Sequence, residues 1–179
     1  RAGGEYPRTA GVEPMSGRQQ SKTDKNDWQT PDRVLDPIQR TDPITTDPCA
    51  APDTNIGEIN ITEDVDGLTT PWDGVVFMNP EFGNKGDWID RAIDQYENNG
   101  GVERVYILTP DSTDVKSWWH GKLRPKCTWT VFFEGRVKYI DPATGNQEKS
   151  PPGGAALSIL GDPPNETLRA LSEVGDVMK

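Results

Sequence analysis

Apolar residues form two kinds of pattern along this chain, continuous runs and helical spacing, and together these predict a mixture of strands and helices. Residues 75–78 form a continuous apolar run that stops at Asn79-Pro80, as expected of a strand that is buried on both faces. Residues 102–108 form a second run of this kind. Between the two runs, apolar residues recur at helical spacing over residues 87–98, and Asn-Asn-Gly-Gly then provides a stop signal. Strand, helix and strand in this order are typical of a parallel sheet.

Weaker signals lie on both sides of this central unit. Thr30 followed by Pro31 predicts the cap and first residue of a short helix, which Pro37 should limit. The remaining predicted elements are short strands at residues 44–46 and 56–61, a helix at 113–123, strands at 128–133, 137–140 and 155–160, and a closing helix at 165–174 capped by Asn165. The pattern predicts an α/β fold, with a mostly parallel sheet and an antiparallel strand near the C-terminus.

The composition of the first 26 residues differs from that of the rest of the chain. Residues 1–26 contain almost no apolar residues and no periodicity, so we expect a disordered N-terminal tail before a single domain over residues 27–179. Cys49 and Cys127 lie far apart without CxxC spacing, which argues against a structural zinc site and favours reduced thiols. No apolar run approaches the ~20 residues that span a bilayer. We therefore expect a cytoplasmic protein with no membrane partner and no metal; the oligomeric state is open.

The formal charge of −10, from 29 acidic and 19 basic residues, bears on the choice of partner. Phosphate neutralisation provides much of the affinity for nucleic acids, so either the partner is not nucleic acid or the acidic residues lie away from a local basic face. The densest basic stretch and its nearest downstream neighbour are Lys116, His120, Lys122, Arg124, Lys126 and Arg136. Trp118 and Trp119 are interleaved with them, which predicts a strip that faces DNA phosphates. The alternative is that Trp118 or Trp119 belongs to the core and the lysines are merely solvated.

The segment Asn79-Pro80-Glu81-Phe82 carries the most informative chemistry. In α/β sheets, ligands bind beyond the carboxyl ends of the strands, and this segment directly follows the predicted strand at residues 75–78. Methylation of an exocyclic amino group needs acceptors for its hydrogens, which Asn79 Oδ1 and a backbone carbonyl held by Pro80 can provide. Phe82 can stack on a base that has left the duplex. Taken alone, the segment is also compatible with an ordinary turn between a strand and a helix.

Residues 79–82 resemble the Asn/Asp-Pro-Pro-Tyr/Phe motif of amino-methyltransferases, with Glu81 in place of the second proline. Other segments resemble the phage-type DNA N6-adenine methyltransferase family, in the same order along the chain. They are Asp27-Trp28-Gln29-Thr30-Pro31, Asp47-Pro48-Cys49-Ala50, residues 61–64, 66–68, 72–74 and 108–110, Asp114 and Gly135-Arg136-Val137. The resemblance covers about residues 26–160. It implies a fold with a Rossmann-like methyltransferase sheet. It also implies an enzyme that transfers a methyl group from S-adenosylmethionine to N6 of an adenine flipped out of double-stranded DNA.

The resemblance also implies roles for individual residues. Asn79, Pro80 and Phe82 would carry catalysis and base binding. The S-adenosylmethionine site would comprise Asp27, Trp28, Thr30, Pro31, Asp47, Pro48 and Cys49, and the position of Glu63 and Asp64 after the second predicted strand adds these two acids as candidates. A carboxylate at Asp47 can accept hydrogen bonds from the ammonium group of the cofactor, and Glu63 or Asp64 can bind ribose hydroxyls. Each acid is otherwise a solvated loop carboxylate, and no GxGxxG fingerprint follows the first predicted strand.

Other functions fit the same sequence. A related amino-methyltransferase would act on cytosine N4, on RNA or on a protein amide. A catalytically silent methyltransferase-like domain would instead act as a binding module or virion component. If the protein is viral, the host cytoplasm is its expected location.

Overall fold

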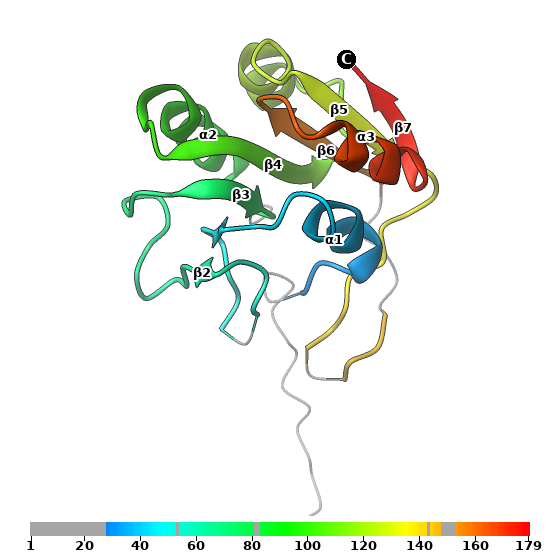
Figure 1. Ribbon diagram of the computed structural model, residues 1–179, viewed down its shortest axis with the longest axis horizontal. Helices are drawn as coiled ribbons and strands as arrows, with labels where there is room; N and C mark the ends of the chain where they lie inside the picture. Colours follow the sequence, from blue (N-terminus) through cyan, green and yellow to red (C-terminus); the bar gives the residue numbers. More distant parts are fainter. Residues whose placement is uncertain (1–27, 53, 81–82, 143, 148–152) are drawn as a thin grey trace, which may run out of the picture.

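The computed structural model describes residues 28–52, 54–80, 83–142, 144–147 and 153–179, so the predicted tail lies outside the described residues. Seven strands form one sheet in the order β2-β1-β3-β4-β6-β5-β7 (Figure 1). The strands are β1 (Thr46–Asp47), β2 (Ile59–Asn60), β3 (Gly74–Met78), β4 (Val102–Pro110), β5 (Trp129–Phe133), β6 (Ala155–Leu160) and β7 (Gly175–Met178).

The sheet has a parallel half and an antiparallel half. Strands β2, β1, β3 and β4 pair in parallel. Strand β6 lies antiparallel between β4 and β5, and β7 pairs antiparallel with β5. The predicted α/β class is therefore confirmed. The antiparallel part is larger than predicted, because β6 and β7 both run against the other strands.

Helices cover both faces of the sheet, which explains the continuous apolar run in β3. Val75 and Phe77 belong to one core cluster with α1 (Asp32–Gln39) and α3 (Asn165–Ser172). Val76 and Met78 belong to a second cluster with α2 (Lys85–Asn98) and the π-helix η2 (Lys116–Leu123). Successive side chains of a strand point to opposite faces, so every position of a strand covered on both faces is apolar.

The predicted N-caps of two helices are wrong by one residue. Pro31 rather than Thr30 is the N-cap of α1, and Pro164 rather than Asn165 is the N-cap of α3; neither helix has a side-chain cap bond. The prediction that Pro37 limits the first helix is also wrong, because α1 continues through Pro37 to Gln39. Buried apolar side chains on the same helix hold this last turn against the sheet, Ile38 among them.

Several other predicted boundaries also change. The strand predicted at 56–61 shortens to β2, and the strand predicted at 137–140 is reduced to isolated bridges of Ile140 with Gln29 and Gln147. The predicted helix at 113–123 forms as η2, with π-helical geometry. The closing helix ends at Ser172 and the chain returns as β7, which was not predicted. A four-residue strand without an apolar run has no clear local signal, because pairing with β5 defines it.

A buried polar cluster connects the end of α1 to β4. The Arg104 guanidinium donates to both carboxylate oxygens of Asp42, with Nε–Oδ2 at 2.5 Å and Nη2–Oδ1 at 3.0 Å. The Tyr106 hydroxyl also donates to Asp42 Oδ2, at 2.6 Å. Asp42 is 4% exposed, so these three bonds compensate for the burial of its charge.

Candidate active site

The topology brings two distant segments to one edge of the sheet. After β1 the chain passes to β2 on one side, and it later returns as β3 on the other side. The carboxyl ends of β1 and β3 therefore border the point at which the strand order reverses, where ligands bind in open α/β sheets. Asp47 ends β1 and Asn79 follows β3 directly.

A cavity of about 610 Å³ opens at this edge. Its lining residues are Pro48, Cys49, Ala50, Ala51, Pro52, Ile61, Thr62, Glu63, Asp66, Gly67, Leu68, Asn79, Asn84 and Trp88. This volume is in the range of small-molecule sites. The described lining includes the acids Glu63 and Asp66 and no lysine or arginine, so it favours a ligand that carries positive charge.

Asp47 lies buried next to this lining, with 3% of its surface exposed. Its Oδ1 accepts a hydrogen bond from the Cys49 backbone N–H at 3.0 Å. Burial raises the pKa of Asp47 from 3.8 to about 7, although the Cys49 N–H partly opposes the shift. A carboxyl that changes charge near neutral pH therefore adjoins the cavity.

Asn79 is half-buried at the cavity and bonds to the segment before α1. Its Nδ2 donates to Thr30 Oγ1 at 3.3 Å, and Thr30 is 6% exposed. Pro80 follows in a buried position. Thr30 and Pro31 were both predicted to contact a cofactor, but the cavity lining includes neither of them, and Trp28 packs against the core on the α1 side. The predicted residues Asp27 and Phe82, together with Glu81, lie outside the described residues.

An aromatic wall completes the cavity, and the sequence pattern predicted only a helix over the residues that include Trp88. Trp88, in the first turn of α2, stacks on Trp72 with 6.4 Å between ring centroids and 23° between planes. The Trp72 indole N–H donates to the Gly67 carbonyl at 2.8 Å. A Cβ at Gly67 would lie 2.0 Å from the Pro48 carbonyl oxygen, so this close contact requires glycine. The sequence signal that could have identified Trp88 as a cavity residue was its position soon after the Asn79 segment.

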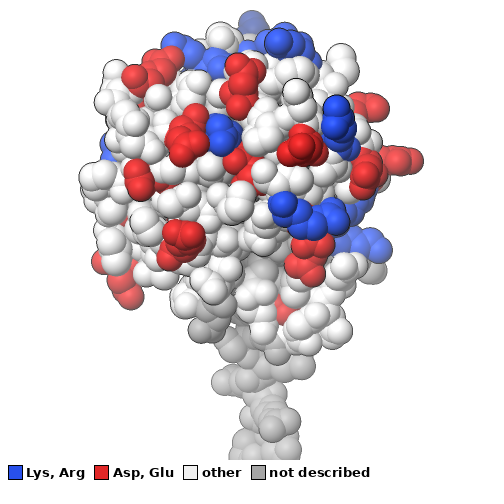
Figure 2. Space-filling view, in the orientation of Figure 1, with Lys and Arg blue, Asp and Glu red and all other residues white. Residues whose placement is uncertain are grey.

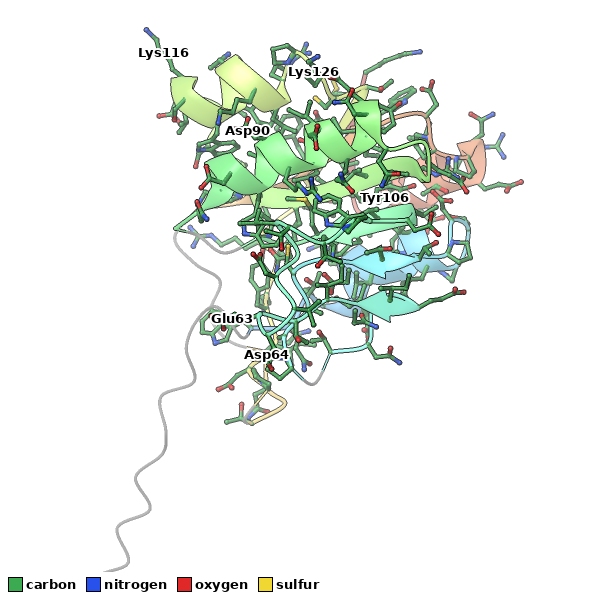
Figure 3. All side chains as sticks on the ribbon, turned by 90° about the vertical axis from the view of Figure 1, so that its left-hand side faces the viewer. Glu63, Asp64, Asp90, Tyr106, Lys116 and Lys126 are labelled. Carbon is green, nitrogen blue, oxygen red and sulfur yellow. The ribbon has the colours of Figure 1, made fainter. Side chains whose placement is uncertain are left out.

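The structure separates the two candidate acids after β2. Glu63 lines the cavity, whereas the cavity lining does not include Asp64. Both side chains are exposed on the loop that Figure 3 shows far from Lys116 and Lys126.

The predicted basic strip is divided between the two edges of the sheet. Lys116 follows the carboxyl end of β4 and Arg136 follows that of β5, whereas Arg124 and Lys126 precede β5 and lie at the opposite edge. Two of the lysines also pair with acids of α2, since Lys122 Nζ lies 2.6 Å from Asp90 Oδ2 and Lys126 Nζ lies 2.6 Å from Glu97 Oε1. Lys116, His120, Arg124 and Arg136 are exposed.

The structure also shows where the tryptophans of the predicted basic strip lie and how the acidic side chains are distributed. Trp118 and Trp119 are buried in the core on the α2 side, which confirms the core alternative for both of them. Acidic side chains are scattered over the face shown in Figure 2 rather than gathered in one patch.

Two further findings concern membrane spans and metal sites in the described residues. No helix in the described ranges is long and apolar enough to cross a membrane. Within the same ranges, no three His, Cys, Asp or Glu side chains are grouped so that they could hold a metal ion.

Comparison with known proteins relates the chain to a family of enzymes. The sequence model of a family described as DNA N-6-adenine-methyltransferase (Dam) matches residues 17–175, which include all the strands except the last residues of β7. No curated protein matches the chain.

Proposed function

Because the chain belongs to the DNA N-6-adenine-methyltransferase family, we propose that it transfers the methyl group of S-adenosylmethionine to N6 of adenine in DNA, at the cavity beyond the carboxyl ends of β1 and β3. Family membership confirms the resemblance seen in the sequence and implies DNA adenine methylation in general. The cofactor, the Rossmann-like methyltransferase character of the sheet and the roles of individual residues are the finer parts of the proposal.

The chemistry of the cavity fits S-adenosylmethionine. This molecule carries a sulfonium and an ammonium against one carboxylate, and the described lining contains acids but no bases. The volume of about 610 Å³ is suitable for a ligand of this size. When bound, S-adenosylmethionine provides an electrophilic methyl group on a positively charged sulfur.

Three residues are assigned to cofactor binding. Asp47, at the end of β1, would accept hydrogen bonds from the ammonium group in its ionised form. Glu63, on the loop after β2, would accept from the ribose hydroxyls. The Trp88 ring would provide an apolar wall, since Trp72 and Gly67 hold it in place.

Asn79 is assigned to catalysis, and its position on the cavity at the carboxyl end of β3 is the observation that carries the proposal. The N6 lone pair of adenine is delocalised into the ring, so the amine is a poor nucleophile. Asn79 Oδ1 and the carbonyl held by Pro80 would accept the two amine hydrogens and direct the lone pair towards the methyl group. The N–C bond forms as the C–S bond breaks, and one amine proton leaves to solvent.

For DNA, the proposal requires that the target adenine leaves the duplex, with Phe82 available to stack on it. Lys116 and Arg136 are the predicted cations that follow strands ending at the cavity edge, so they are the proposed phosphate contacts. Arg124 and Lys126, at the opposite edge, are not proposed for this role.

The test is methylation of unmethylated DNA with a radiolabelled donor, followed by digestion to nucleosides, at several salt concentrations. We expect N6-methyladenine from the wild-type protein and at least a roughly 100-fold loss of rate for Asn79→Ala. Asn98→Ala, an exposed position at the end of α2 away from the cavity, is the control and should retain full activity. Absence of N6-methyladenine at every salt concentration would refute the proposal, and label in N4-methylcytosine would support the related-transferase alternative.

A further inference from the structure

We infer that Thr30 is a positioning residue that restrains the Asn79 side-chain amide by accepting a hydrogen bond from its Nδ2. This inference rests on the function proposed for Asn79. The two residues are 49 positions apart in the sequence, yet Asn79 Nδ2 donates to Thr30 Oγ1 at 3.3 Å. Thr30 is 6% exposed, so little water competes for this bond.

Orientation matters because the two ends of an amide have opposite hydrogen-bonding character. When Nδ2 points to Thr30, Oδ1 is the end that remains for a ligand in the cavity. A reversed amide would direct N–H donors at an exocyclic amine whose hydrogens are also donors. No hydrogen bond would form, and donors would be left unsatisfied in a partly buried site.

The backbone holds Thr30 in place from both sides. Gln29, the preceding residue, exchanges two hydrogen bonds with Ile140, with N–O distances of 2.9 Å and 3.0 Å. Pro31, the following residue, is the N-cap of α1 and its carbonyl accepts from the Val34 N–H at 2.9 Å. No side-chain hydrogen bond caps that helix at Pro31, and among the described residues the Thr30 hydroxyl bonds to Asn79.

The structure therefore gives Thr30 a different role from the cofactor contact that the family resemblance implies. Its hydroxyl acts on the amide that would bind the target base, and the cavity lining does not include it. Loss of the hydroxyl should therefore slow the chemical step and leave cofactor binding unchanged.

Substitutions at Thr30 test this directly, because Thr30→Val removes the hydroxyl at nearly constant volume and Thr30→Ser keeps it. We expect kcat about tenfold lower for Thr30→Val, an unchanged dissociation constant for S-adenosylmethionine, and nearly wild-type kcat for Thr30→Ser. Thr130→Val is the matched control, since Thr130 is also 6% exposed but lies near the start of β5, away from the cavity edge. A Thr30→Val kcat within twofold of wild type would overturn the inference. Weaker cofactor binding with unchanged kcat would overturn it as well, in favour of cofactor contact.

A second readout does not depend on activity. The Asn79 side-chain NH2 signals in a ¹⁵N NMR spectrum can be assigned by their loss in Asn79→Asp. We expect Thr30→Val to shift these signals and to speed their exchange with solvent, whereas Thr30→Ser and Thr130→Val leave them in place. Unchanged signals in Thr30→Val would refute the bond. If the bond is present and the wild-type protein forms no N6-methyladenine, the proposed function fails while the contact between Thr30 and Asn79 stands.

Discussion

Replacement of Asp47 by asparagine should stabilise the unliganded protein at high pH while it weakens cofactor binding. Asp47 is 3% exposed and accepts one hydrogen bond from the Cys49 backbone N–H. None of the ion pairs among the described residues includes it. Within the part of the chain that the structure describes, its negative charge is therefore buried without a paired cation, and burial favours the protonated form.

The size of the effect follows from the pKa of Asp47, which burial raises from 3.8 to about 7. Because the folded pKa lies above the unfolded value, the stabilising contribution is complete below pH 3.8 and is lost as the pH rises through about 7. Each pH unit in this window costs about 1.4 kcal/mol, so the loss between pH 5 and pH 7 is roughly 3 kcal/mol. The asparagine of the variant does not ionise, and any cost of its extra N–H donors, about 1–3 kcal/mol, does not depend on pH.

Urea unfolding at pH 5, 6, 7 and 8 measures this effect as the difference in free energy of unfolding between Asp47→Asn and wild type. We expect that difference to move by roughly 3 kcal/mol in favour of the variant over this range. Asp64→Asn, an exposed change outside the cavity lining, is the control and should show no such trend. Parallel pH profiles for Asp47→Asn and wild type would refute the reasoning.

Binding measurements complete this test, because only ionised Asp47 can pair with an ammonium group. The affinity of the wild-type protein for S-adenosylmethionine should rise with pH up to about 7 and then level off, whereas Asp47→Asn should bind more weakly and without this rise. Calorimetric titration over the same pH range measures both. Equal affinity of the two proteins at pH 8 would show that Asp47 does not bind the cofactor.

Two further predictions concern stability and DNA contact. Asp42→Asn should lower the free energy of unfolding by about 3–5 kcal/mol in urea, because it leaves the Arg104 guanidinium without its buried partner; a loss below about 1 kcal/mol would contradict this. Arg136→Gln should reduce the slope of log affinity for DNA against log salt by about 1 in a fluorescence anisotropy titration, whereas Lys126→Gln, at the opposite edge and paired with Glu97, should leave it unchanged. Equal effects of the two substitutions would contradict the division of the basic residues.

The centre of the fold was predictable because its signals are local. β3, α2 and β4 each combine an apolar pattern of sufficient length with nearby breakers, and the structure places all three close to the predicted ranges. The position of Asn79 directly after a buried strand was enough to place it at a ligand-binding edge. The family resemblance also needed no structure, since it depends on the order of short motifs.

The remaining features depend on residues that meet only when the chain folds. No local pattern tells Glu63 from Asp64, because the path of the loop after β2 decides which of them lines the cavity. The pairing of Lys126 with Glu97 likewise depends on the packing of η2 beside α2. Short elements such as β7 have too few apolar positions to be predicted, and neighbouring strands stabilise them.

The same contrast holds for the residues of the candidate site. The sequence identified Asp47, Asn79 and Thr30 as candidates, since their motifs are continuous in the chain. The sequence did not reveal that Asp47 is buried with no cation paired to it among the described residues, or that Thr30 bonds to Asn79 rather than lining the cavity. Burial and hydrogen bonding are properties of neighbours in space, and folding brings Thr30 and Asn79 together although they are 49 positions apart in the chain.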